Sequence, residues 1–396
     1  MIFCQAALTR CPAARNRMMR RISIIFILAL AMIVAGCSKD VPTKAVSSDD
    51  AWRHDVTLPV PVMFGASTNP TKAMINTTQD MNHGLFGVFA FDKSVLADAV
   101  GDLTADDGMN MRNAYSVCKV KDGAGSLDLV DDWYYPMNRE TEYEFFAYHI
   151  YQSLDNPSVK LVMEEKRALI EMTVAGTNDV LWAKASSAEP ITVDGVECGG
   201  YNAKYVREGG AMPSFHFSHP VACIAFTACV DAEMSGNYMR IDHVTMLGVH
   251  TKATLCIVDI ENPENNGKFV PCAGDVISDK MVVKGGTGNL FLPLTASVQS
   301  VGLDAFIVPG AESLKIKVTY SMFSKGADGV AGTSDDAVQT SGNEVEAEIQ
   351  AGGDSGVFES GHRYLYNLKM ITPKPLGAGE DAMEVITVTG YEEAFK

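Results

Sequence analysis

Alternation of apolar and polar side chains is the feature that most limits how this chain can fold. Residues 314–322 place an apolar side chain at every second position, and in residues 344–349 glutamates alternate with Val345, Ala347 and Ile349. A repeat of two puts successive side chains on opposite faces of a strand, whereas a helical face repeats every three to four residues. Similar short stretches, broken by Gly, Pro, Asn and Asp, recur along the chain and predict an all-β fold of packed sheets.

Most apolar stretches after residue 56 are therefore predicted to be strands. They span 85–91, 114–120, 143–151, 168–174, 215–230 (as two strands), 241–249, 253–258, 289–294, 303–308, 363–371 and 384–391. Helical spacing is scarce, and we expect at most one short helix in residues 93–100 and another in residues 160–169.

The first expected strand, residues 56–64, contains two prolines. Pro59 and Pro61 have the same parity, so both missing N–H groups fall on one side of the strand. Such a strand can pair along one edge only, which predicts an edge strand of the kind that can be removed or replaced.

Residues 18–37 carry the features of an export signal. Arg20 and Arg21 form a positive segment, and the apolar stretch of residues 22–33 is too short to span a bilayer comfortably. The segment ends in Val-Ala-Gly before Cys37 and so resembles a bacterial lipobox, which implies that Cys37 becomes the lipidated first residue of the mature chain. The alternative is an ordinary secretory signal in which Cys37 is incidental.

The expected organisation follows from this signal and from breaks in the strand pattern. Residues 1–36 are the signal peptide, with residues 1–17 a start assigned too early, and residues 37–55 form a polar, lipidated tether or pro-segment. A polar break at residues 231–237 separates two strong strand regions. The two predicted sandwich domains are residues 56–231 and 232–396.

Charge excludes one class of partner. The formal net charge is −17, and the first 36 residues hold five arginines and no acid, so the mature part is still more acidic. This sign is wrong for binding nucleic acid by phosphate neutralisation, and no nucleic-acid partner is expected.

Six cysteines follow Cys37, and none belongs to a CxxC pair, which argues against a zinc site. They are Cys118, Cys198, Cys223, Cys229, Cys256 and Cys272. Export permits disulfides, but Cys223 and Cys229 lie in one strand-like stretch and cannot bridge each other. Buried free thiols are therefore favoured, and disulfides stay open as the alternative.

Residue pairs with catalytic or metal-binding potential are few. His216 and His219 suggest a metal pair or a base, but no third ligand lies nearby in the sequence, and structural histidines are favoured. No nucleophile, zinc-protease or nucleotide-binding motif is present. The glycine-rich residues 284–289 are expected to form a hairpin loop. We expect no enzyme activity and no cofactor.

Two further groups of residues could bind small ligands. Asp328, Asp335 and Asp336 lie in a glycine-rich loop and are candidates for a calcium ion, although a solvated hairpin loop is favoured because the spacing is not that of an EF-hand. Aromatic residues between 133 and 148 could stack on sugars, but strand alternation favours core packing. These aromatic residues are Trp133, Tyr134, Tyr135, Tyr143, Phe145, Phe146 and Tyr148.

Several sequence segments together resemble the fimbrillin family of Bacteroidetes lipoproteins, the subunits of type V pili. They are the lipobox at Cys37, MFGAS with Thr71-Lys72-Ala73 behind it, GLFGVFAF at 84–91, WYYPMNRETEYEFFAYH at 133–149, DVLWAKAS at 179–186, FHFSHPVACIAFTA at 215–228, GHRYLYNLKM at 361–370 and MEVITVTGYEEA at 383–394. Their order and spacing carry the resemblance.

The resemblance implies two transthyretin-like Greek-key sandwiches in tandem, exported as an outer-membrane lipoprotein and displayed at the cell surface in a fimbria. It also implies that an arginine-specific protease removes an N-terminal segment, after which a strand donated by another fimbrial subunit fills the vacated groove. Arg53, just before the first strand, is the candidate cleavage site, and the alternative is an ordinary solvated arginine. Arg112 and Arg139 also look accessible, but cutting there would destroy a domain.

The sequence leaves more than one function open. The first is a non-catalytic fimbrial subunit that serves adhesion. The alternatives are a monomeric surface lipoprotein that binds a glycan or a host protein, and a tip adhesin with host or bacterial surface ligands. Stalk, tip and anchor positions are not distinguished.

Overall fold

The computed structural model describes residues 51–68, 77–98, 100–137, 140–150, 159–174, 176, 179–270, 277–278, 281–283, 293–352, 354–371 and 386–394. Residues 51–55 belong to a compact unit distinct from the unit that begins at Val56. The first unit contributes the one-turn helix α2 (Ala51–His54). All the sheets belong to the second unit. Within the described residues, no helix has the length and apolarity to cross a membrane.

The largest sheet has seven strands in the order β10-β7-β3-β4-β5-β2-β13. Their bounds are β10 (Val180–Lys184), β7 (Tyr143–Ile150), β3 (Leu85–Asp92), β4 (Ala114–Lys121), β5 (Ala124–Leu129), β2 (Phe64–Thr68) and β13 (Ser214–Phe217). Neighbours are antiparallel except β2 and β13, which run parallel. The two end strands are also joined, because the bridges Trp182↔Ser218 and Ala185↔Phe215 link β10 to the β13 segment.

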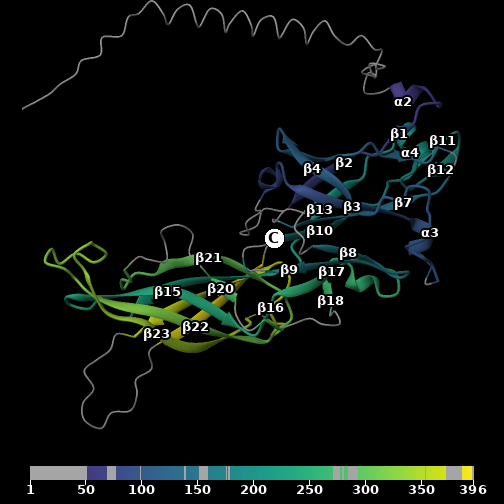
Figure 1. The fold of residues 1–396 in the computed structure, drawn as a ribbon. Helices are drawn as coiled ribbons and strands as arrows, with labels where there is room; N and C mark the ends of the chain where they lie inside the picture. Colours follow the sequence, from purple (N-terminus) through teal and green to yellow (C-terminus); the bar gives the residue numbers. More distant parts are fainter. Residues whose placement is uncertain are drawn as a thin grey trace, which may run out of the picture. The chain divides into compact units, whose positions relative to one another are not determined.

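Three four-stranded sheets complete most of the fold (Figure 1). Sheet C holds β18 (Phe269–Val270), β17 (Lys252–Asp259), β9 (Arg167–Thr173) and β8 (Lys160–Met163). Sheet D holds β21 (Gln299–Ile307), β14 (Ala222–Val230), β24 (His362–Met370) and β25 (Ile386–Ala394). Sheet F holds β20 (Met281–Val283), β15 (Asn237–Leu247), β22 (Ser313–Ser324) and β23 (Ala337–Gln350).

Short pairs and turns of helix connect these sheets. The strand pairs are β1 (Val60–Pro61) with β6 (Tyr134–Tyr135), β11 (Ile191–Val193) with β12 (Val196–Cys198), and β16 (Val249–His250) with β19 (Ile277–Ser278). The helical turns are η1 (Thr78–Met81), α3 (Lys93–Leu96), α4 (Ala203–Arg207) and η2 (Pro263–Asn265).

Two apolar clusters hold the sheets together. In one, β14, β24 and β21 of sheet D face β15 and β22 of sheet F, as in a β-sandwich. In the other, β3 and β7 of the seven-stranded sheet face β9 and β17 of sheet C. The predicted all-β fold with sandwich packing is confirmed.

Strand β14 explains one unusually apolar stretch of sequence. Ile224 and Phe226 belong to the cluster between sheets D and F, whereas Cys223 belongs to the cluster beside sheet C. Both faces of this strand are therefore buried, and its residues need not alternate. The predicted split of residues 215–230 into two strands is confirmed by β13 and β14.

Strand pairing crosses the predicted domain boundary at residue 231. The strand β14, which precedes the boundary, pairs with β24, which follows it. In the same way β9 pairs with β17 across the boundary. Residues 231–236 do separate β14 from β15, but the division into two domains at this position stays a prediction.

Two predicted elements need correction. Residues 160–169 form the β8–β9 hairpin rather than a helix, because their apolar side chains pack in the cluster beside sheet C and Glu164 and Arg167 close the turn with an N–H···O bond of 2.9 Å. Residues 56–64 are not one edge strand, since they are divided between the short strand β1 (Val60–Pro61) and the start of the interior strand β2 at Phe64. The expected helix after residue 93 is confirmed as α3.

Candidate functional site

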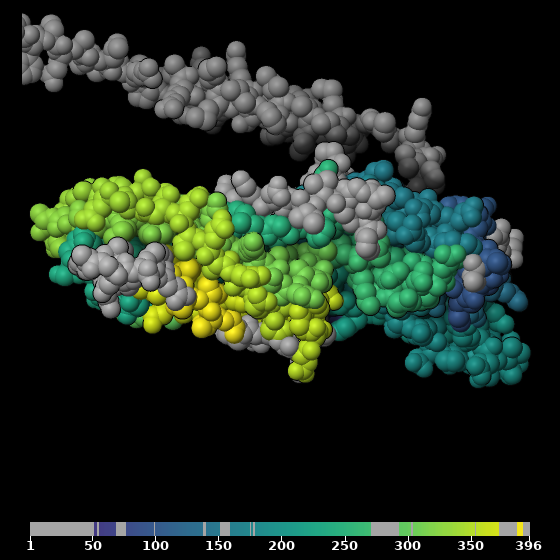
Figure 2. Space-filling model, turned by 90° about the horizontal axis from the view of Figure 1, so that it is seen from below, coloured from purple at the N-terminus to yellow at the C-terminus, as the bar shows by residue number. Residues whose placement is uncertain are grey.

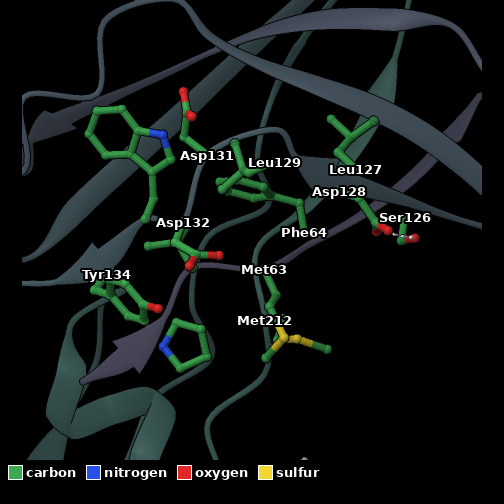
Figure 3. A pocket seen from close by; sticks show the side chains of 13 residues that line it. Met63, Phe64, Ser126, Leu127, Asp128, Leu129, Asp131, Asp132, Tyr134 and Met212 are labelled. Carbon is green, nitrogen blue, oxygen red and sulfur yellow. Dashed lines mark hydrogen bonds between the residues drawn. The ribbon is translucent and has the colours of Figure 1, made fainter. Parts of the chain in front are cut away.

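A groove lies beside the first strands, with a cavity volume of about 400 Å³. Three separate stretches of chain line it, together with the lone side chain of Met212. The lining residues are Pro61, Val62, Met63, Phe64, Ser126, Leu127, Asp128, Leu129, Asp131, Asp132, Trp133, Tyr134 and Met212. Figure 3 shows Asp131, Asp132 and Tyr134 on one side and Met63, Met212 and Phe64 on the other.

Backbone pairing fixes the walls of this groove. Val60 and Pro61 pair with Tyr135 and Tyr134, and the Val62 N–H donates to the Trp133 carbonyl at 2.9 Å. After these residues the chain enters β2, which pairs with β5. The first strands and the β5–β6 segment are therefore held as one rigid frame.

Phe64 anchors this frame in the core. Its ring lies 5.1 Å from the ring of Phe145 and 5.1 Å from that of Phe215, and only 3% of the residue is exposed. Alternation along β2 buries Phe64, Ala66 and Thr68 and leaves Gly65 and Ser67 on the other face. The groove thus has one deep aromatic wall and an open rim.

The groove is acidic. Among the lining residues that the structure describes, three are aspartates and none is Lys, Arg or His. Asp128 pairs with Lys119, whose Nζ lies 2.5 Å from Oδ2, and it also accepts a bond of 3.1 Å from the Ser126 hydroxyl. Asp131 and Asp132 are exposed at the rim.

The predicted aromatic cluster divides between core and groove. Tyr135, Tyr143, Phe145, Phe146 and Tyr148 are buried, which confirms core packing for these five. The other two, Trp133 and Tyr134, line the groove, and Tyr134 is 38% exposed. Core packing is therefore not the role of every member.

His216 and His219 do not form a metal pair in the structure. The His216 ring lies 2.8 Å from the Ser67 hydroxyl, across the β2–β13 pairing. His219 is buried, and its Nδ1 lies 2.8 Å from the Oδ1 of the fully buried Asp179. Both histidines thus have structural partners, as predicted.

The three calcium candidates do come together. Ligand atoms of Asp328, Asp335 and Asp336 lie within 4.8 Å of one another in the β22–β23 loop. The Asp336 carboxylate already accepts bonds from the N–H groups of Gly326 and Gly332 and from the hydroxyl of Tyr238. Desolvation acts to raise the pKa of Asp336, but these donors outweigh it and hold the pKa below its ordinary value. Calcium binding stays a prediction.

The described cysteines are free thiols, as favoured from the sequence. Cys118, Cys223, Cys229 and Cys256 are buried, and Cys198 is half-buried. Burial raises the pKa of Cys118 to about 11 and that of Cys256 to about 12, so neither supplies a thiolate at neutral pH. Cys272 lies outside the described residues.

The residues expected in processing are only partly described. Cys37, Arg139 and the glycine-rich residues 284–289 lie outside the described residues. Arg53 sits in α2, with its guanidinium 4.5 Å from the centre of the Trp52 ring. Arg112 is not an accessible arginine, because its side chain is 17% exposed and pairs with the nearly buried Asp107 at 2.9 Å.

The C-terminal strand β25 is the outer strand of sheet D. It pairs antiparallel with β24 over nine residues, from Ile386↔Met370 to Ala394↔His362. Gly390 lies against the ring of Tyr366, where an added Cβ would come within 2.4 Å of the ring, and the Tyr366 hydroxyl donates to the Gln350 carbonyl at 2.6 Å. Figure 2 shows the yellow C-terminal residues at the molecular surface beside lime-green neighbours.

Comparisons with known proteins found similarity to solved structures alone. No family model and no curated protein matches the chain. Solved structures do: a proposed cell adhesion protein from Bacteroides ovatus (16% identity, 86% of this chain and 99% of that chain, TM-score 0.48) and another from Bacteroides uniformis (14%, 85% and 98%, 0.45). A third is the fimbrial anchor protein Mfa2 from Porphyromonas gingivalis (11%, 86% and 100%, 0.36).

The groove itself was not foreseen from the sequence. Met212 lies about 80 residues beyond Tyr134 in the chain, and no spacing rule relates the two. The pair Trp133 and Tyr134 directly after Asp131 and Asp132 was the one available signal. It was outweighed by the alternation that buries the neighbouring aromatics.

Proposed function

We propose that this protein is a non-catalytic subunit of adhesive fimbriae, exported as a lipoprotein through Cys37 and joined to other fimbrial subunits by strand donation. Support for export comes from the signal and lipobox in residues 18–37. Support for the fimbrial role comes from the order of the fimbrillin-like segments along the sequence. A location at the cell surface, with an outer-membrane lipid anchor, follows from the same proposal.

The observation that carries strand donation is the position of β25 at the edge of sheet D. An edge strand can leave by breaking one ladder of hydrogen bonds, whereas an interior strand must break two. The residues Ile386, Val388 and Gly390 of β25 decrease in size along one face. That face could insert beside another subunit's sheet, with alternate side chains entering its core.

The acceptor position in this proposal is β2. It lies between β5 and β13, so a subunit without β2 would expose unpaired backbone on both neighbours and an apolar slot where Phe64 sits. A cut after Arg53 leaves β1 and β2 attached, and the next arginine in the chain is the partly buried Arg112. In the proposal, cleavage at Arg53 therefore frees the chain from its lipid anchor, and the donated strand displaces β2.

The test is the assembly state of the full chain in cells with and without an arginine-specific surface protease. Unheated samples on a denaturing gel should form a ladder only with the protease, and mass spectrometry should find a mature N-terminus at His54. The Arg53→Lys variant keeps the charge but resists this protease, and it should stay monomeric. Deletion of residues 384–396 should also abolish the ladder.

Other outcomes would overturn the proposal. A lipid-modified Cys37 that persists in both strains, with no ladder in either, would exclude a polymerising subunit. A ladder that survives deletion of residues 384–396 would exclude β25 as the donor.

A second candidate function is a monomeric surface lipoprotein or tip adhesin that binds a ligand directly. The acidic, aromatic groove of about 400 Å³ favours it, since ligand pockets are concave and combine apolar walls with a few polar groups. The same gel separates the two candidates, because a monomeric binder gives no ladder.

A further inference from the structure

We infer that the groove beside the first strands binds the side chain of an arginine presented by a partner polypeptide. The inference deepens the second candidate function and does not depend on strand donation. It rests on the shape, the rings and the charge of the groove.

The walls offer surfaces that suit a flat cation. Trp133 and Tyr134 line the groove from one segment, while the buried ring of Phe64 supports its floor from the core. A guanidinium within about 6 Å of an aromatic ring centre is attracted to the ring face, most strongly by Trp. Met63 and Met212 add polarisable thioether surface beside these rings (Figure 3).

The rim is open to a partner. Tyr134 is 38% exposed and Met212 is 44% exposed, so both side chains reach solvent at the rim. Exposed apolar groups around a concave site are typical of binding surfaces. A peptide that lays one side chain into the groove would cover both residues.

Charge complementarity selects the occupant. Among the described lining residues three are aspartates and none is basic, and Lys119, which pairs with Asp128, stands outside this lining. A carboxylate beside a guanidinium forms charge-assisted hydrogen bonds, and the planar fork of arginine can serve two acceptors at once. A neutral sugar could stack on the same rings and donate hydroxyl bonds to the carboxylates, but it carries no positive charge to offset theirs.

The test compares two peptides that differ only in charge. The probes are acetyl-Gly-Arg-Gly-amide and its counterpart with neutral, nearly isosteric citrulline, titrated into the purified full chain. We expect the arginine peptide to bind at least about tenfold more tightly than the citrulline peptide. Its affinity should fall as the salt concentration rises. Tryptophan fluorescence should report the binding, and Trp133→Phe should remove that signal.

Matched variants separate the groove from the overall charge. The double variant Asp131→Asn, Asp132→Asn should weaken the arginine peptide about tenfold, whereas the exposed Asp194→Asn in the β11–β12 turn should change nothing. Asparagine tolerates the positive φ of 51° at residue 194, so the control should fold normally.

Three results would overturn the inference. One is equal affinity for the two peptides, and another is no binding of either at millimolar concentration. The third is binding of a neutral disaccharide at this groove, abolished by Trp133→Phe, without binding of the arginine peptide. Each leaves the gel-ladder test of strand donation unaffected.

Discussion

The strands β2 and β25 lie near opposite ends of the described unit, yet they are held in opposite ways. β2 lies inside its sheet, with β5 on one side and β13, about 150 residues later in the chain, on the other. Among the described strands, β25 lies at the edge of its sheet and pairs with β24 alone. Apolar residues recur at every second position in the sequences of both Phe64–Thr68 and Ile386–Gly390, so the sequences alone do not reveal the difference.

This difference shows which strand can leave its sheet at the lower cost in free energy. Removing β2 exposes two backbone ladders and empties the space around Phe64, whereas removing β25 exposes one ladder and a few side chains such as Ile386. In a chain that donates β25 and accepts at β2, the donated strand would leave a position with one paired neighbour and enter a position with two.

The largest expected effect is on β2. Phe64→Ala removes a ring packed on Phe145 and Phe215 and should lower the free energy of unfolding by about 3–5 kcal/mol. Urea denaturation of the full chain measures it. Thr389→Ala, on an exposed position of β25, is the control and should change stability by less than about 0.5 kcal/mol. A loss below about 1 kcal/mol for Phe64→Ala would contradict a tightly held β2.

The next effect concerns the seat of β25. Gly390→Val drives a branched side chain into the Tyr366 ring, where even a Cβ would lie 2.4 Å from the ring, and should cost about 1–3 kcal/mol. Because β25 is an edge strand, we expect it to detach before the sheet unfolds. Faster hydrogen exchange in residues 362–370, with the rest unchanged, would record this detachment, and Thr389→Val should not produce it. A uniform increase across the whole protein would argue that β25 is integral to the fold.

Acid should weaken the sheet that holds β2. Burial lowers the pKa of His149 below its ordinary value, although the Leu85 carbonyl and Asp179 act against this shift. The folded state thus favours the neutral ring while the unfolded chain takes up a proton near pH 6.5, so stability is full above about pH 6.5 and falls as the pH drops below it. The slope should not exceed about 1.4 kcal/mol per pH unit.

The measurement is urea denaturation at several values between about pH 7.5 and 5.5. His149→Gln should flatten the pH dependence, whatever it does to stability at neutral pH. If the variant keeps the full slope, another group is responsible and His149 does not make β2 acid-sensitive.

The smallest effect is expected at the loop between β22 and β23. Asp336 already accepts bonds from Gly326, Gly332 and Tyr238, so millimolar calcium should move the melting temperature by less than about 2 °C relative to chelator. Asp335→Asn serves as the control. A larger shift that this variant abolishes would establish a calcium site instead.

Much of the secondary structure followed from local pattern. The alternation in residues 314–322 became β22, and the long apolar stretch of residues 215–230 became β13 and β14. The prediction of a short helix in residues 160–169 was wrong, because the mixed spacing of the apolar side chains there suits a helix as well as a hairpin. Only the packing of Leu161 and Met163 against the cluster beside sheet C decides between the two.

The candidate groove was less accessible to such reasoning. The sequence placed Trp133 and Tyr134 next to two aspartates, but it did not say that they would face Met63 and Met212. Those contacts depend on strand register over separations of about 70 to 80 residues, which no local pattern encodes.

By itself, then, the sequence determined the all-β class and the approximate position of most strands, and it predicts an export signal and lipobox in residues 18–37. Those properties depend on neighbours within ten or so residues, where side-chain alternation and turn residues act directly. Only the tertiary structure decided that β2 is interior and β25 is at an edge, and that an acidic aromatic groove forms beside β1. Partner strands and cavity walls come from distant parts of the chain, so they are fixed by packing over long range and not by local propensity.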